Sequence, residues 1–294
     1  MSKIFEALRK TEGGWADAAN AVLADEVILT PATAHTNEES VCIANPMEAP
    51  VGTQPGSTKC EVRVESIQLE PGSPLLPFDG TDTQAAEQYR IIRTKIHHHP
   101  AQPKMLLISS AMSGDGKTIN AINLAAALSL EEDLRVLLLD CDFRRSSATN
   151  LLGLAAAPGL AEVLRDEVSL EASLVRIAQF PNLYLLPPGN ASSNPAELLS
   201  TARWRLLMKE FQSEFRFVIV DAPPIGAVAD YELLQQACDG VIVVVRQDHT
   251  NRQLWQRALE TVPKAKQVGV ILNCAEDWFL WKTHSYYYYS GKVH

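Results

Sequence analysis

The chain has 294 residues, of which 46% are apolar and 21% charged, and a formal net charge of -9 at pH 7. This composition can bury a core of ordinary size, and the acidic balance excludes a general electrostatic attraction to nucleic acid or anionic lipid. The five cysteines are scattered and never spaced C-x-x-C, which argues against a disulfide framework or a zinc ribbon. No apolar run approaches the roughly 20 residues of a membrane span. We therefore expect a cytoplasmic globular protein.

The N-terminal quarter of the chain differs in composition from the rest. Residues 1–80 carry five Lys and Arg against twelve Asp and Glu, a net charge of -7, and seven prolines lie between Pro31 and Pro77. Small and polar residues separate these prolines. The composition predicts an acidic, proline-rich, disordered linker over residues 15–81.

The first residues form an exception within this quarter. Residues 1–14 can form a short amphipathic helix in which Ile4, Phe5 and Leu8 share one face. Three apolar side chains make a weak stripe, so the helix is either marginal in isolation or a docking helix for a partner.

From residue 82 onward, short apolar runs alternate with helix-like segments. The runs are residues 105–108, 136–139, 183–186, 217–220, 241–245 and 268–272. Apolarity that is continuous rather than alternating indicates strands covered on both faces. The sequence therefore predicts an α/β domain over residues 82–283, with a mainly parallel sheet covered by helices on both faces.

A phosphate-binding motif follows the first apolar run. Residues 110–118 read SAMSGDGKT and open an alanine-rich helical segment, the context of a P-loop. Its glycines allow backbone amides to surround a phosphate, Lys117 can reach the outer phosphates, and Thr118 can bind Mg²⁺. The expected fold is thus a P-loop NTPase. The candidate nucleotide-binding residues are Ser113, Gly114, Asp115, Gly116, Lys117 and Thr118.

Three carboxylates follow two other apolar runs. Asp140 and Asp142 come after residues 136–139, and Asp221 ends residues 217–220. The carboxyl ends of strands line the ligand crevice of such a sheet, so we expect all three acids to face the phosphates. A lone Asp after a strand is more often a cap or turn residue; the upstream P-loop favours the ligand interpretation.

Four of the seven tyrosines are consecutive, Tyr286, Tyr287, Tyr288 and Tyr289, in a tail over residues 284–294. Buried aromatic core is the alternative for such a run, but these tyrosines lie among Ser, Gly, Lys and His at a chain end. This context favours an exposed tail over a buried core.

Together these residues resemble the bacterial tyrosine kinases, P-loop autokinases associated with capsule and exopolysaccharide production. The similarity extends from about Gln84 to the C-terminus and includes Glu87, Arg90 and Arg93, which match the E-x-x-R-x-x-R assembly motif of that family. A solvated helix face is the alternative for these three charges. The opening MSKIFEALRK is similar to the exosortase-associated subgroup.

The resemblance implies an ATP-dependent tyrosine autokinase that phosphorylates its tail between the subunits of a ring. It implies Lys117 and Asp140 as catalytic residues, Asp140 accepting the phenol proton, and Thr118, Asp142 and Asp221 as Mg²⁺ ligands. It also implies regulation of polysaccharide synthesis or export through a separate membrane co-polymerase or chain-length regulator, which would recruit the chain to the inner face of the membrane. No nucleic acid partner is expected.

The alternative is a nucleotide-gated assembly or regulatory ATPase of the partition-ATPase type, without kinase activity. Those relatives carry a second lysine early in the P-loop, where this chain has Met112. Residues 278–281, Trp-Phe-Leu-Trp, can be a hydrophobic hook for a partner or a flap on the core; the sequence does not distinguish the two.

Overall fold

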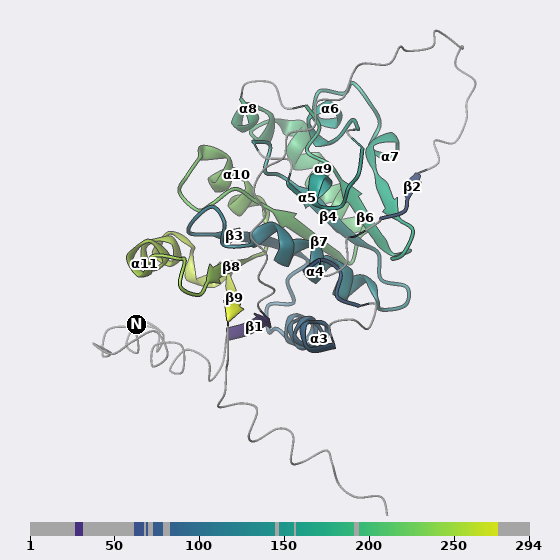
Figure 1. The fold of residues 1–294 in the computed structure, drawn as a ribbon. Helices are drawn as coiled ribbons and strands as arrows, with labels where there is room; N and C mark the ends of the chain where they lie inside the picture. Colours follow the sequence, from purple (N-terminus) through teal and green to yellow (C-terminus); the bar gives the residue numbers. More distant parts are fainter. Residues whose placement is uncertain are drawn as a thin grey trace, which may run out of the picture.

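The computed structural model describes residues 62–67, 69, 73–78, 83–144, 147–155, 157–190 and 194–275, together with the backbone of a strand at Val27–Pro31. The strands are β1 (Val27–Pro31), β2 (Arg63–Glu65), β3 (Met105–Ser110), β4 (Val136–Asp140), β5 (Val175–Ile177), β6 (Leu183–Leu186), β7 (Phe217–Asp221), β8 (Gly240–Arg246) and β9 (Gln267–Ala275). They form one sheet in the order β1-β9-β8-β3-β7-β4-β6-β5-β2 (Figure 1). Neighbouring strands pair in parallel, except that β5 and β6 are antiparallel. The mainly parallel sheet and all six predicted strands are confirmed.

Helices cover both faces of the sheet, as predicted. They are α3 (Thr83–His97), α4 (Lys117–Ser129), α5 (Ser147–Leu151), α6 (Leu160–Leu164), α7 (Leu170–Ser173), α8 (Pro195–Leu199), α9 (Ala202–Glu214), α10 (Ala229–Ala237) and α11 (Arg252–Thr261), with a 3₁₀ turn η1 at Lys264–Lys266. The cluster on one face contains side chains of α3, α4 and α5; the cluster on the other contains side chains of α6, α8, α9, α10 and α11.

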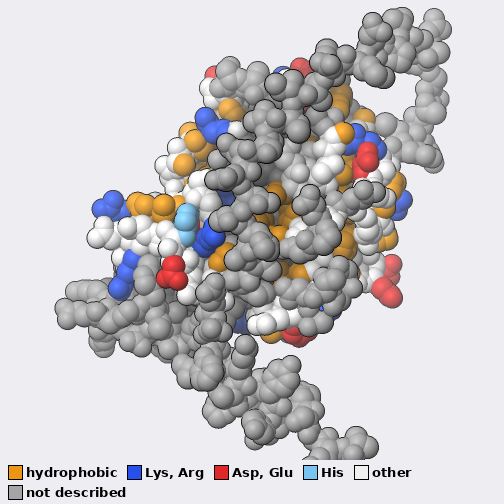
Figure 2. All heavy atoms as spheres, in the orientation of Figure 1, with side chains coloured by type: hydrophobic (Ala, Val, Ile, Leu, Met, Phe, Trp, Pro, Cys, Tyr) orange, Lys and Arg blue, Asp and Glu red, His pale blue; other side chains and the backbone are white. Residues whose placement is uncertain are grey.

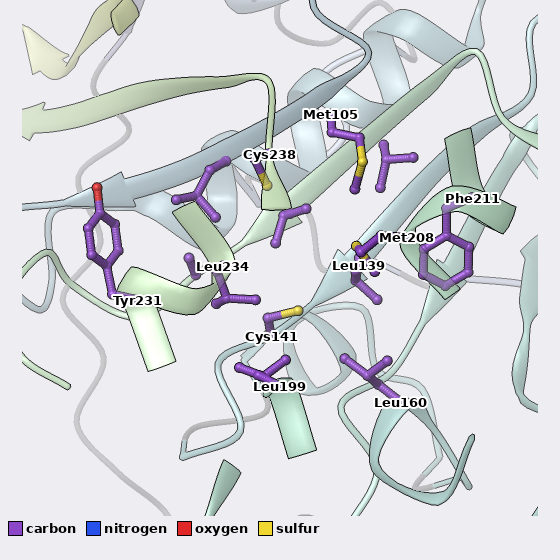
Figure 3. Close-up of a cluster of buried hydrophobic side chains, with 14 of the residues drawn as sticks. Met105, Leu139, Cys141, Leu160, Leu199, Met208, Phe211, Tyr231, Leu234 and Cys238 are labelled. Carbon is purple, nitrogen blue, oxygen red and sulfur yellow. The ribbon is translucent and has the colours of Figure 1, made fainter. Parts of the chain in front are cut away.

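Alternate residues of each central strand supply these two clusters. On β3, Leu106 and Ile108 pack toward α3 and α4, whereas Met105 and Leu107 pack toward the opposite helices. Figure 3 shows part of the second cluster, where Met208 and Phe211 of α9 and Leu234 of α10 lie near Met105 and Leu139 of the sheet. Strands buried on both faces require apolar residues at every position, which explains the continuous apolar runs in the sequence.

The strand order brings the predicted site together at one edge. Strand β7 lies between β3 and β4, so the carboxyl ends of the three strands are adjacent. The P-loop follows β3, the first acidic pair follows β4, and the third acid ends β7. The sheet alone therefore gathers the P-loop and the three acids from segments spread between residues 110 and 221.

The prediction of a disordered linker over residues 15–81 is wrong for its last part. Strand β2 pairs with β5, and Ile67, Leu75 and Leu76 are buried. The amide of Asn123 on α4 also holds this segment, because the backbone amide of Leu76 donates to its oxygen at 2.7 Å and its nitrogen donates to the carbonyl of Pro74 at 2.8 Å. Residues 62–67 and 73–78 thus pack on the sheet domain, and β1, which also lies within the predicted linker, adds a strand to the other edge of the sheet.

The predicted helix at residues 1–14, residues 278–281 and the tyrosine-rich tail lie outside the described residues. None of the described helices is both long and apolar enough to cross a membrane. On the described part of the face drawn in Figure 2, basic and acidic side chains are interspersed, with no broad patch of one sign.

Candidate nucleotide and phosphoryl-transfer site

The P-loop joins β3 to α4 through two glycines in the left-handed region. Gly114 and Gly116 both have φ of +89°, a conformation that side chains with a Cβ rarely adopt. A Cβ on Gly116 would also collide with the side-chain nitrogen of Asn273, which donates to the carbonyl of Asp115 at 2.9 Å. Both glycines are therefore required by the shape of the loop, as the motif predicts.

Asp115 is fully buried and its carboxylate turns into the protein. It accepts hydrogen bonds from the backbone amide of Met112 at 3.0 Å and from the hydroxyl of Thr250 at 2.8 Å, and it pairs with Nδ1 of His249 at 3.0 Å. The side chain thus fixes the loop against the β8–α11 connection. Among the predicted nucleotide-binding residues, the side chain of Asp115 is a support for the loop rather than a wall of the cavity.

Lys117 begins α4 and is directed at the acids. Its ammonium donates to Oδ2 of Asp142 at 2.8 Å and lies 3.7 Å from Oδ1 of Asp221 and 3.4 Å from the hydroxyl of Thr118. Burial alone would lower the pKa of this lysine, but the negative charges of Asp221 and Asp142 outweigh it, so its pKa is raised. Lys117 is therefore a fixed positive charge in a buried acidic site.

Asp140 lies directly opposite Asp221 in the β4–β7 pairing. Its two oxygens accept hydrogen bonds from the backbone amides of Asp142 and Ala148, both at 3.1 Å. Burial first, and the charge of Asp221 next, raise the pKa of Asp140 to about 8. Neither Asp140 nor Asp221 is among the residues that line the cavity, so the expectation that these acids face the phosphates stays a prediction.

Asp221 is fully buried, yet neither of its oxygens meets a hydrogen-bond donor at good geometry among the described residues. Burial raises its pKa to about 6, against the opposing effects of the nearby Lys117 ammonium and Thr118 hydroxyl. A buried carboxylate without donors is costly unless a cation pairs with it. Its oxygens, with those of Thr118 and Asp142, form the hard donor set that Mg²⁺ prefers. These residues therefore fit the metal that the P-loop implies.

A cavity of about 540 Å³ opens beside the P-loop. Its polar lining includes Lys117, Thr118 and Asp142. Apolar side chains also line it: Leu151, Pro223, Pro224, Ala227 and Val228. Arg144 also lines this cavity; its guanidinium is exposed and lies 3.8 Å from the buried carboxylate of Asp230.

Comparison with known proteins agrees with this geometry. The AAA domain family model matches residues 103–270. The tyrosine-protein kinase YwqD of Bacillus subtilis is 35% identical over 211 residues, which cover 70% of this chain and 87% of that protein. This chain belongs to the bacterial tyrosine-protein kinases.

Two further comparisons place this kinase among its relatives. The tyrosine-protein kinase Ptk of Acinetobacter johnsonii is 32% identical over 239 residues, or 80% of this chain, and the matched part spans 32% of the length of that relative. The kinase domain of Escherichia coli tyrosine kinase ETK has a TM-score of 0.61 and 28% identity, over 67% of this chain and 78% of that domain.

The predicted assembly residues of the kinase lie on α3, and they differ in their surroundings. Glu87 and Arg90 are exposed and pair with each other at 3.1 Å. Arg93 instead turns to α4, where it pairs with Glu131 at 3.3 Å and donates to the carbonyl of Ala127 at 3.2 Å. Arg93 is thus already engaged within its own chain.

Several supporting residues of the kinase site were not predicted. His249 and Thr250 contact the carboxylate of Asp115, and Asn273 donates to the backbone carbonyl of Asp115. Arg246 donates to the backbone carbonyl of Gly114 at 3.2 Å. A signal was present in the sequence, because polar residues follow the apolar runs at 241–245 and 268–272 just as Asp221 follows residues 217–220. Polar residues that follow any parallel strand are candidates for the site, because the carboxyl ends of all these strands reach the same edge of the sheet.

Proposed function

We propose that this protein is an ATP-dependent tyrosine autokinase whose acceptor is its own C-terminal tyrosine cluster. The observation that carries the proposal is a single cavity lined both by phosphate-site residues, among them Lys117 and Asp142, and by apolar side chains. A nucleotide hydrolase needs room only for water beside the outer phosphate. An apolar lining suits an aromatic acceptor.

The P-loop amides and the N-terminus of α4 would hold the phosphates of ATP, with Thr118, Asp142 and Asp221 holding Mg²⁺. Mg²⁺ bound there neutralises negative charge on the phosphates. Lys117 now contacts Asp142 at 2.8 Å. With nucleotide bound, this ammonium would instead contact the outer phosphates.

The acceptor phenol would bind against the apolar lining, which includes Leu151, Pro223 and Pro224. Internal tyrosines are poor candidates for this role. Tyr89 and Tyr231 are buried, and the ring of Tyr184 is packed against Phe215 and under the guanidinium of Arg135. Among the seven tyrosines of the chain, the four of the tail at 286–289 remain.

Asp140 is the proposed acceptor of the phenol proton. A phenol with a pKa near 10 is about one part in a thousand ionised at neutral pH, so a carboxylate that takes the proton assists transfer. The raised pKa of Asp140, about 8, gives it more basicity than an ordinary aspartate. Each oxygen of Asp140 accepts one backbone hydrogen bond, from Asp142 or Ala148, and keeps a lone pair that can take the proton.

Transfer between subunits is proposed because a tail rarely folds back into its own site. The exposed pair Glu87 and Arg90 on α3 supports an assembly contact, as expected for a ring. We also propose that a separate membrane co-polymerase or chain-length regulator recruits the kinase to the inner face of the membrane. Phosphorylation of the tail would then regulate exopolysaccharide or capsule synthesis or export.

The decisive experiment incubates purified protein with ATP and Mg²⁺ and measures phosphotyrosine by mass spectrometry. Phosphate on residues 286–289 is expected. ATP hydrolysis without any phosphotyrosine, at protein concentrations where the chain assembles, would instead identify a nucleotide-gated regulatory ATPase.

A further inference from the structure

Helices α3 and α4 lie side by side (Figure 1), and their mainly apolar contact also contains buried polar side chains. Tyr89 of α3 is 2% exposed, and Asn120 and Asn123 of α4 are 0% and 1% exposed. Burying an amide or a hydroxyl is costly unless its hydrogen bonds are satisfied. The neighbouring α3 side chains Ile92 and Ile96 are apolar, so these polar residues call for an explanation beyond packing.

A chain of hydrogen bonds runs from α3 to the P-loop. The hydroxyl of Tyr89 donates to Oδ1 of Asn120 at 3.1 Å, and Nδ2 of Asn120 donates to the carbonyl of Gly116 at 3.0 Å. Gly116 is the left-handed glycine that caps α4 and shapes the phosphate loop. Two bonds therefore separate the assembly helix from the phosphate-binding backbone.

The direction of each bond is fixed by its neighbours. The carbonyl of Gly116 can only accept, so the amide nitrogen of Asn120 faces it and the amide oxygen faces Tyr89. Asn123 donates to the Tyr89 hydroxyl at 3.1 Å, which leaves the tyrosine proton free for Asn120. Burial raises the pKa of Tyr89 well above its ordinary value. The phenol therefore stays a neutral donor at physiological pH.

The opposite face of α3 carries the exposed residues Glu87 and Arg90, and Arg90 is next to Tyr89 in sequence. We propose that Tyr89 is a positioning residue of the nucleotide site, which orients the P-loop through Asn120 and so couples docking of α3 on a neighbouring subunit to nucleotide binding. This inference rests on the proposed function in its assembly step. By linkage, any factor by which assembly tightens nucleotide binding equals the factor by which nucleotide tightens assembly.

The experiment titrates a fluorescent ADP analogue with Mg²⁺ into the full chain, at a dilute concentration and at a concentration where it assembles. For the wild type we expect tighter binding in the assembled state. Tyr89→Phe keeps the ring and removes the proton donor. It should weaken binding about two- to tenfold, the effect of one hydrogen bond, and make the affinity independent of assembly.

Two controls separate this role from general stability. Tyr231→Phe removes an equally buried hydroxyl on α10, which accepts from Gln235 at 2.9 Å and touches neither α3 nor the P-loop in the hydrogen bonds described; it should leave the affinity unchanged. Asn123→Ala removes three hydrogen bonds but leaves the Tyr89–Asn120–Gly116 chain. It should lower the melting temperature more than Tyr89→Phe and still show affinity that depends on assembly.

Two results would overturn the proposal: Tyr89→Phe with wild-type affinity in both states, or Asn123→Ala losing the coupling as Tyr89→Phe does. If the wild type does not assemble, the assembly step of the proposed function fails by itself, and the coupling with it. The affinities of dilute Tyr89→Phe and Tyr231→Phe would then decide whether Tyr89 positions the P-loop.

Discussion

The ammonium of Lys117 donates to the carboxylate of Asp142 at 2.8 Å and also lies 3.7 Å from Oδ1 of the buried Asp221. The P-loop lysine thus serves as the counter-ion of the acids. The same lysine is the proposed partner of the outer phosphates, so nucleotide binding would draw it away from Asp142.

Lys117→Met should abolish autophosphorylation, because no positive side chain then reaches the outer phosphates. The change also leaves the buried acids without their cation, which should cost about 3–5 kcal/mol of unfolding free energy at pH 8. Radioactive ATP labelling and urea unfolding test the two effects. A variant that still labels its tail would contradict the P-loop assignment.

The nucleotide-free protein should lose stability as the pH rises from about 4 to 8 through the contributions of Asp140 and Asp221. Their pKa values are raised from 3.8 to about 8 and about 6, so the folded chain binds protons more tightly than the unfolded chain in this window. Each pKa unit corresponds to about 1.4 kcal/mol. Urea unfolding at several pH values measures how the unfolding free energy depends on pH.

Asp221→Asn provides the matched control for that pH dependence. The charge of Asp221 is the second cause of the raised pKa of Asp140, after burial. Removing it should therefore lower the pKa of Asp140 and move the loss of stability to lower pH. An unchanged pH profile would show that the two carboxyl groups do not interact.

Asp140→Asn and Asp142→Asn should have different effects. Asp142 lines the cavity and belongs to the proposed Mg²⁺ ligands, so its loss should weaken Mg²⁺-dependent nucleotide binding. Asp140→Asn should leave that binding nearly unchanged and slow transfer, because an amide does not accept the phenol proton. Nucleotide titrations with and without Mg²⁺, together with single-turnover labelling, compare the variants. The opposite pattern would exchange the two roles.

Replacing Tyr286, Tyr287, Tyr288 and Tyr289 together by Phe should remove most of the incorporated phosphate and leave ATP hydrolysis intact. Mass spectrometry of the labelled protein locates any phosphate that remains. Substantial phosphate on Tyr89 or Tyr231 would contradict the tail assignment, since both are buried.

Arg90→Ala should weaken assembly of unphosphorylated protein with little effect on the fold, because Arg90 is exposed and pairs only with Glu87 in the salt bridges described. Arg93→Ala should weaken assembly and also lower the melting temperature, since Arg93 ties α3 to Glu131 and Ala127. Light scattering coupled to size exclusion at two salt concentrations measures the assembly of both variants.

Tail phosphorylation should disperse the assembly, because each phosphotyrosine adds about -1.5 to -2 charges and the subunits then repel one another. A wild type that stays monomeric at every concentration would remove the ring.

The sequence by itself determined the central strands, the P-loop and the three acids, because each depends on local pattern. Strands buried on both faces must be apolar at every position, and a phosphate loop needs glycine, lysine and threonine at fixed spacing. This local pattern does not predict the short strand β5 or the edge strand β2. Each has three residues, and only pairing with a neighbour decides its conformation.

Only the tertiary structure decided how the polar side chains of the site divide their roles. Asp115, Asp140 and Asp142 belong to similar local patterns, yet one supports the loop, one accepts backbone hydrogen bonds and one lines the cavity. Asn273 and His249 reach the P-loop from more than 130 residues away. The partner of a buried polar group depends on which strands are neighbours, and that order is set by the packing of the whole sheet.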